Sequence, residues 1–129
     1  MATRSTIAKL NDNGTVTSIY CDWDGYPKHV GVILEGFYTD ERKIEKLIDL
    51  GDLSSLSYEI GSQQDFDNPR AGTCVAYGRD RGETGIDALQ HDSVTEWLRF
   101  RDRSGCEYGY LWDGKCWTTF NMTGGYHND

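Results

Sequence analysis

The chain has 129 residues, of which 37% are apolar and 26% are charged, with a formal net charge of −8. This length predicts one domain, residues 1–129, that buries roughly two-thirds of its unfolded surface and needs no disulfide or metal to hold its core. No apolar run approaches the ~20 residues of a membrane-spanning helix, which excludes an integral membrane protein. The first residues lack the apolar centre of a secretory signal, so we expect a cytoplasmic location.

The negative charge also limits the class of partner. A general nucleic-acid binder needs a basic surface to neutralise phosphates, so direct nucleic-acid binding is not expected. Residues 1–67 hold six Lys/Arg and twelve Asp/Glu, whereas residues 68–129 hold seven and nine, so most of the negative field lies on the first half. Such a field favours a basic partner, or it simply keeps the protein in solution.

The first predicted elements form a hairpin followed by a helix. Residues 3–10 and 15–21 are predicted strands, and Asn13-Gly14 between them supplies the positive φ angles of a tight turn. The pattern then changes to an apolar stripe typical of a helix of about 10 residues, with Pro27 in its first turn. The stripe consists of Val30, Ile33, Leu34 and Phe37.

A second helix is predicted next, with Thr39 or Asp40 as its cap and Gly51 as its end. Its apolar stripe is Ile44, Leu47 and Ile48. Its acidic residues, which are candidates for binding a partner, are Asp40, Glu41, Glu45 and Asp49. Lys43 and Lys46 interrupt this acidic helix, and this argues against a pure mimic of DNA.

The second half is predicted to begin with loops and a short strand. Residues 53–60 are interpreted as a packed loop, residues 61–72 as a surface excursion, and residues 73–77 as a strand. Ser93 and Glu96 match a capping box, which predicts a third helix with Val94, Trp97 and Leu98 turned inward.

The chain ends in a second predicted hairpin. Asp113-Gly114 favours a two-residue turn that would place Tyr110 opposite Trp117. Two hairpins, a central strand and about three helices predict an α+β domain, in which helices cover a mostly antiparallel sheet.

Cysteines and histidines give little indication of chemistry. Cys21, Cys74, Cys106 and Cys116 are expected to be reduced thiols, and no C-x-x-C pair exists. The histidines are not spaced to complete a zinc site, so no metal or other cofactor is predicted. Cys21 and His29 are the one pair near enough in sequence for nucleophilic catalysis, and this signal is too weak to assign a catalytic residue.

The first candidate site is Cys21-Asp22-Trp23-Asp24-Gly25. Two carboxylates after an apolar strand can bind magnesium, and the motif resembles the first motif of haloacid-dehalogenase-type phosphatases. The alternative is that Asp24 caps the following helix while Asp22 supports its positive end. Trp23, Tyr26 and Tyr38 either form an aromatic contact surface or belong to the core.

Two arginine-containing segments follow. In an extended loop, Arg79 and Arg81 would point the same way and grip a phosphate or carboxylate, which makes a nucleotide a possible ligand. The alternative is that these arginines pair with Asp80, Glu83 or the acidic helices and hold the loop in place. Residues 97–103 mix aromatics with three arginines, which suits a small anion- or base-stacking patch or a solvated helix face.

Several motifs resemble a family of small accessory proteins encoded by tailed bacteriophages and prophages. They are Thr3-Arg4-Ser5-Thr6-Ile7, Ile19-Tyr20-Cys21, Trp23-Asp24-Gly25-Tyr26-Pro27, His29-Val30-Gly31, Phe66-Asp67-Asn68-Pro69, Tyr77-Gly78-Arg79-Asp80-Arg81-Gly82-Glu83, and the aromatics Tyr108, Trp112 and Trp117 around Gly114. In that family a histidine often stands where this chain has Asp22, which weakens a two-carboxylate metal site. The resemblance implies no catalytic residue.

What the resemblance implies is a biological setting. Accessory phage proteins often bind and inhibit a host machine, including CRISPR and other defence systems. The first hypothesis is therefore a non-enzymatic inhibitor that binds a host protein in the host cytoplasm. Its expected contacts are the acidic second helix and the turn with Trp23, Asp24 and Tyr26. The alternatives are a protein that binds or cleaves nucleotides or cyclic nucleotides with Arg79, Asp80, Arg81 and Glu83, and a component of the virion.

Overall fold

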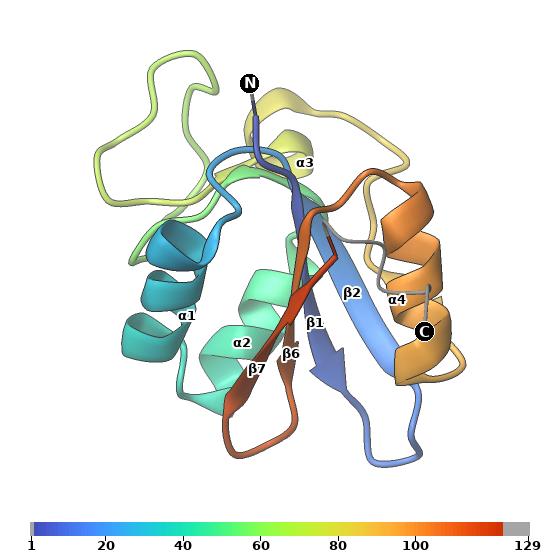
Figure 1. The fold of residues 1–129 in the computed structure, drawn as a ribbon. Helices are drawn as coiled ribbons and strands as arrows, with labels where there is room; N and C mark the ends of the chain where they lie inside the picture. Colours follow the sequence, from blue (N-terminus) through green and yellow to red (C-terminus); the bar gives the residue numbers. More distant parts are fainter. Residues whose placement is uncertain (1, 123–129) are drawn as a thin grey trace.

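The computed structural model describes residues 2–122, which form a seven-stranded sheet with helices on both faces (Figure 1). The strands are β1 (Ser5–Leu10), β2 (Val16–Cys21), β3 (Leu53–Ser55), β4 (Val75–Ala76), β5 (Leu89–His91), β6 (Tyr108–Trp112) and β7 (Trp117–Asn121). The helices are α1 (Val32–Phe37), α2 (Glu41–Asp49), α3 (Tyr77–Arg81) and α4 (Val94–Arg103), and a π-helical turn η1 (Pro27–Gly31) leads into α1. None of the helices in this part of the chain is long and apolar enough to cross a membrane.

The strand pairing confirms the α+β class and corrects the expected sheet. The strand order is β4-β3-β2-β1-β6-β7, and β5 pairs with β2 outside this path. The predicted hairpins β1–β2 and β6–β7 are antiparallel, but β3 runs parallel to β2 and β6 runs parallel to β1. The sheet is therefore mixed, because the chain crosses over through η1, α1 and α2 before it returns as β3.

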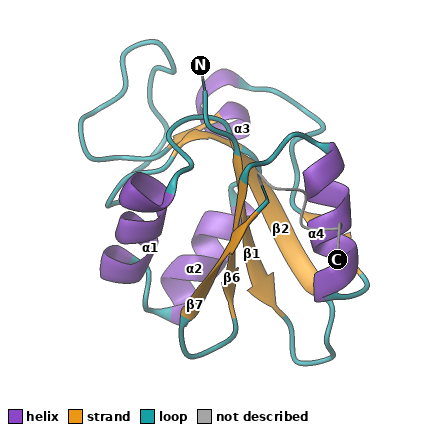
Figure 2. Ribbon diagram, in the orientation of Figure 1, coloured by secondary structure: helices purple, strands orange, loops and turns teal. Residues whose placement is uncertain are grey.

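The sheet lies between two helical layers, with α1 and α2 on one side and α4 on the other (Figure 2). Ile7 of β1 belongs to a large core cluster with α1 and α2, while its neighbour Ala8 belongs to a smaller cluster with α4. Trp97 is the largest side chain of the smaller cluster and is fully buried, and its Nε1 donates to Thr6 Oγ1 at 3.0 Å. Burial on both faces explains why β1 does not alternate between apolar and polar residues.

The predicted helices occur where their end signals place them. The side chain of Asp40 accepts a hydrogen bond from the Arg42 amide at 2.9 Å, and this caps α2. Gly51 follows the end of α2 with a φ of +80°. Ser93 Oγ accepts from the Glu96 amide at 3.1 Å, and Pro27 begins η1. The caps at Asp40 and Ser93 are therefore confirmed, whereas the Glu96 carboxylate accepts from Arg99 and is not seen to complete the capping box.

Four local predictions are wrong. Residues 53–60 are not all loop, because β3 lies at their start, and residues 89–91 form the unpredicted strand β5. The strand expected over residues 73–77 is reduced to Val75–Ala76, and a helix starts at Tyr77. In the closing hairpin Trp112 lies opposite Trp117 and Tyr110 opposite Thr119, two residues away from the predicted register. There, the Asp113 carboxylate accepts from the amides of Lys115 and Cys116, which stabilises a four-residue loop.

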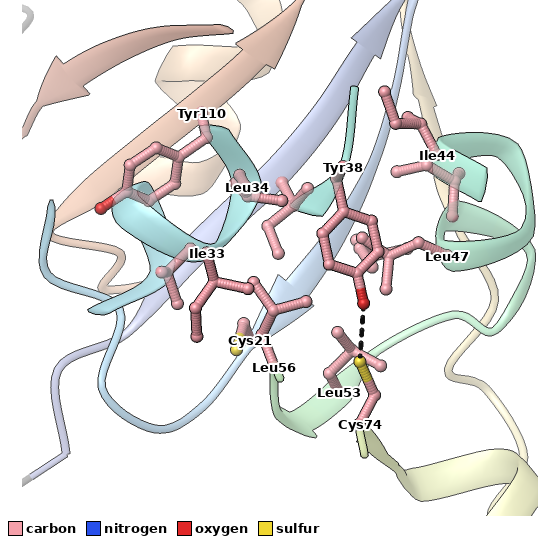
Figure 3. Packing of buried hydrophobic residues seen from close by; sticks show 14 of the residues in the cluster. Cys21, Ile33, Leu34, Tyr38, Ile44, Leu47, Leu53, Leu56, Cys74 and Tyr110 are labelled. Atoms are coloured by element: carbon pink, nitrogen blue, oxygen red, sulfur yellow. Dashed lines mark hydrogen bonds between the residues drawn. The ribbon is translucent and has the colours of Figure 1, made fainter. Parts of the chain in front are cut away.

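The end of α1 reverses the expected roles of two aromatic residues. Phe37, predicted in the buried stripe, is 47% exposed, whereas Tyr38, a candidate for the exposed surface, is fully buried. Tyr38 leaves the helix with φ −123°, which turns its ring into the core between α1, α2 and β3 (Figure 3). Its hydroxyl donates to Ser57 O at 2.8 Å and lies 3.3 Å from Cys74 Sγ. A buried tyrosine is acceptable here because its hydroxyl has a partner.

Candidate functional site

The loop after β2 is held tightly against the start of β1. The Gly25 amide donates to Thr3 O at 2.8 Å, and Gly25 O accepts from the Tyr110 hydroxyl at 2.6 Å. A Cβ at position 25 would lie 2.6 Å from Ser5 Cβ, so the site requires glycine. Trp23 and Tyr26, on either side of this anchor, are 48% and 40% exposed. The loop is fixed, and its aromatic side chains are presented to solvent.

Asp22 and Asp24 do not act together. Asp22 accepts from the hydroxyls of Tyr77 at 2.8 Å and Tyr20 at 3.3 Å, whereas Asp24 is exposed with a left-handed φ of 55°. The residue that caps η1 is Tyr26, without a side-chain bond, so the prediction that Asp24 caps this helix is wrong. Within residues 2–122, no group of three or more His, Cys, Asp or Glu side chains is arranged to hold a metal ion.

The contact between Asp22 and Tyr77 joins the two sequence motifs in space. Burial of the Tyr77 ring, followed by the hydrogen bond to Asp22, raises the pKa of Tyr77 to about 12. Tyr77 therefore remains a neutral donor to the carboxylate at physiological pH. The loop with Trp23 and the segment with Arg79 are neighbours, a relation that sequence separation alone did not reveal.

The arginine segment is a short helix, not the predicted extended loop. Arg79 donates to both carboxylate oxygens of Asp80, at 2.9 and 3.1 Å, and to the carbonyls of Ile60 and Cys74, each at 2.8 Å. The Asp80 side chain is fully buried, and it also accepts from the amides of Gln64 and Ala76. This network holds residues 60–80 together. Its hydrogen bonds occupy the Arg79 guanidinium, which the nucleotide hypothesis assigned to a phosphate.

Arg81 lies apart from this network. Its guanidinium stacks over the rings of Phe66 at 4.3 Å and Tyr77 at 5.0 Å, and it pairs with Glu83. The structure therefore does not direct Arg79 and Arg81 toward one ligand. The pairings with Asp80 and Glu83 follow the alternative in which the arginines hold their own segment in place.

The acidic residues of α2 lie at the opposite end of β1 from Trp23. Glu41 accepts from Trp112 Nε1 at 3.1 Å and lies 3.3 Å from Lys9 Nζ, and Glu45 lies 3.9 Å from the same amine. The Trp112 hydrogen bond, helped by Lys9, lowers the pKa of Glu41. Lys9 is four residues along β1 from Ser5, a separation of about 13 Å. The predicted acidic and aromatic contacts are thus two surfaces, not one.

Five exposed apolar side chains lie on η1–α1, on the loop before η1, or in contact with the end of α1. We call Trp23, Tyr26, Val32, Phe37 and Tyr58 the α1 aromatic surface; their exposed fractions range from 40% to 59%. Phe37 and Tyr58 are in contact, with ring centroids 4.7 Å apart. Sequence reasoning missed Val32, Phe37 and Tyr58. The exposure of Val32 could have been predicted from the sequence, because Val32 lies about 200° around the helix from the buried residue Val30.

The thiols provide no nucleophile at this site. Cys21 is fully buried, and desolvation raises the pKa of its thiol to about 12. Because the thiolate is the reactive form, Cys21 is inert at neutral pH, and the possible pairing with His29 has no chemical basis.

Comparisons of the chain with protein-family models, with curated proteins and with solved structures gave no match. Function is therefore inferred from the exposed surfaces and from the sequence motifs.

Proposed function

We propose that the chain is an accessory protein encoded by a bacteriophage, and that it binds and inhibits a host protein such as a component of a CRISPR defence system. The observation that carries this proposal is the α1 aromatic surface. Tryptophan and tyrosine are the residues that most often dominate binding energy at protein interfaces. Here, Trp23 and Tyr26 are about half exposed on a loop that Gly25 fixes in place. The resemblance of the sequence motifs to phage accessory proteins supports the biological setting.

The dimensions of the surface suit one protein partner. Trp23 and Tyr26 lie at one end of η1–α1, and the Phe37–Tyr58 pair lies at the other. The eleven residues that follow Tyr26 up to Phe37 span about 16 Å at a helical rise of about 1.5 Å per residue. A standard interface buries about 800 Å² on each partner, a patch about 30 Å across, so one partner can contact both ends. Since both anchors are already positioned, binding requires little ordering of the chain.

Inhibition can be measured directly in bacteria. We expect expression of the chain to restore plaque formation by a phage that an active CRISPR system targets, in a panel of strains with different systems. A chain carrying Trp23→Ala and Tyr26→Ala should fail to restore plaques at the same expression level. Unchanged plaque counts across the panel would contradict inhibition of these systems.

The acidic residues of α2 are proposed as a second contact that speeds association. Glu45 and Asp49 are exposed, whereas Asp40 and Glu41 have structural roles as a cap and as an acceptor from Trp112. Glu45→Gln with Asp49→Asn should slow association with the captured host protein by about tenfold at low salt, with little effect at high salt.

The control for this prediction is Asp67→Asn with Asp92→Asn, two exposed carboxylates that lie on neither α2 nor the hollow beside Glu45 and Asp49. Both pairs of substitutions raise the net charge equally. A difference in association rate between the two variants therefore reflects the position of the charges and not the total charge. Equal association rates for the two variants, measured by surface plasmon resonance, would remove α2 from the binding mechanism.

A further inference from the structure

A separate cavity opens between β5 and α4, and neither of the surfaces described above contributes to it. Its volume is about 240 Å³, and it is lined by residues 90–92 together with Glu96, Arg99, Phe100 and Arg103. The four α4 residues follow the spacing i, i+3, i+4, i+7, so one stripe of the helix forms a wall. Trp97, Leu98 and Arg101 are buried on another side of the same helix.

The hydrogen bonds behind the cavity fix the tautomer of His91. Ser18 Oγ accepts from Arg101 Nε at 3.2 Å and from Arg101 Nη2 at 3.0 Å, and it lies 2.8 Å from His91 Nε2. A hydroxyl has two lone pairs and one hydrogen. His91 Nε2 is the one acceptor within hydrogen-bond distance of this hydroxyl in the part of the chain that the structure describes, so we assign the hydrogen of Ser18 to His91 Nε2. The ring hydrogen of neutral His91 is therefore on Nδ1.

This arrangement makes His91 a fixed donor at the cavity wall. The His91 residue is 8% exposed, and burial, followed by the positive charge of Arg101, lowers its pKa. The imidazole thus stays neutral at physiological pH, and His91 is one of the residues that line the cavity. A buried polar network of this kind is costly unless its groups are satisfied, so an acceptor at Nδ1 would be favourable.

Two neighbouring side chains complete the chemistry of the cavity. Phe100 is 44% exposed, and its ring centroid lies 5.5 Å from that of His91. Arg99 pairs with Glu96 at 3.3 Å, whereas Arg103 forms no ion pair with the residues described between 2 and 122. The cavity therefore combines an accessible aromatic face, an N–H donor and an unpaired guanidinium. Asp92 is the one lining carboxylate without such a pairing in this part of the chain. Its single negative charge is accompanied by the positive charges of Arg103 and of Arg101 behind the cavity.

We propose that this cavity binds a nucleoside monophosphate. The base stacks on Phe100, an acceptor atom on its edge takes the hydrogen of His91 Nδ1, and the phosphate pairs with Arg103. Each contact is one that proteins use for single nucleotides: stacking on an aromatic ring, hydrogen bonding to a base edge, and an arginine–phosphate pair. The volume is below the roughly 300 Å³ of typical enclosed ligand pockets, so it suits one base with the phosphate at the rim. This site is independent of the proposed host-protein surface.

Titration of the ¹⁵N-labelled chain with AMP and UMP, followed by NMR, tests the proposal. The expected result is saturable shifts at His91, Phe100 and Arg103, and an imidazole ¹⁵N spectrum that shows the Nδ1–H tautomer. Phe100→Leu removes the aromatic face but keeps an apolar side chain, and Arg103→Gln removes the charge. Each should weaken binding by about tenfold. Both residues are exposed, so the variants should keep the dispersed spectrum of the folded chain.

The controls separate the parts of the ligand. Inorganic phosphate and the uncharged nucleosides should each bind at least about tenfold more weakly than the nucleotides. Arg42→Gln, which removes an exposed arginine from the hollow beside α2, should have no effect. The proposal is overturned if millimolar AMP and UMP give no localised shifts, if phosphate alone binds as tightly, if neither cavity variant weakens binding, or if His91 has the Nε2–H tautomer.

Discussion

Asp80→Asn is expected to lower the free energy of unfolding by about 3–5 kcal/mol, the usual cost of breaking a buried ion pair on one side. The carboxylate accepts from Arg79 and from the amides of Gln64 and Ala76, and its side chain has no exposed surface. The asparagine amide group would meet donors where the carboxylate offered acceptors. Arg79 would also lose the charge that compensates its own burial. Urea denaturation at neutral pH measures the loss.

The same substitution should change the acid sensitivity of the fold. Burial alone would raise the pKa of Asp80, but hydrogen bonds from Arg79 and the two amides outweigh it, so the folded pKa is lowered from 3.8. The contribution of the carboxylate to stability is therefore complete above about pH 4 and is lost as the pH falls through the folded value. In the Asp80→Asn chain, the free energy of unfolding should therefore fall less than in the parent chain as the pH is lowered below about 4.

Glu83→Gln is the matched control for Asp80→Asn. Glu83 pairs with Arg81 at the surface, where both side chains are more than one-third exposed. Such a pair contributes less than about 1 kcal/mol, so the control should unfold almost like the parent chain. If the two variants lose the same stability, the buried network is not the element that holds residues 60–80.

Trp23→Ala with Tyr26→Ala is expected to reduce affinity for the host partner by at least about 100-fold, because aromatic hot spots each contribute 2 kcal/mol or more. Both side chains are about half exposed, so their removal should leave the fold intact. Capture from bacterial lysate, followed by titration of the captured protein against each variant, measures the change. Leu89→Ala is the control, since Leu89 is 39% exposed on β5 and lies outside the α1 aromatic surface.

The result that would contradict this prediction is equal affinity of the aromatic variant and the parent chain. Loss of affinity in the Leu89→Ala variant as well would indicate a general effect of exposed apolar surface. A circular-dichroism spectrum that matches the parent chain is needed for each variant before affinities are compared.

Local chemistry predicted much of the fold. The turn at Gly14, the Asp40 cap and the Ser93 cap each depend on residues a few positions apart, and each is present in the structure, although Gly14 alone of the predicted Asn13-Gly14 pair has a positive φ. The apolar stripe of α2 is likewise buried as its spacing indicated. These features were readable because the interactions that create them lie within a few residues.

The missed features depend on distant partners. The strands β3 and β5 have three residues each and pair with β2, so no periodicity of their own could reveal them. The helix of Arg79 is stabilised by the contact of Asp80 with Gln64, and the burial of Tyr38 needs Ser57. For the candidate surface, Trp23 and Tyr26 were identified from residue type, whereas the fold brings Tyr58 into contact with Phe37.

The measurement that tests the role of the α1 aromatic surface most directly is site-specific photo-crosslinking in the host cell. A benzophenone amino acid is placed at Tyr26, at Tyr58 or at Phe100, which is similarly exposed on α4 across the sheet. We expect positions 26 and 58 to form a covalent adduct with the same host protein, and position 100 to form none with it. Adducts from position 100 alone, or the absence of any adduct from positions 26 and 58 in cells where the chain restores plaques, would show that the partner binds elsewhere.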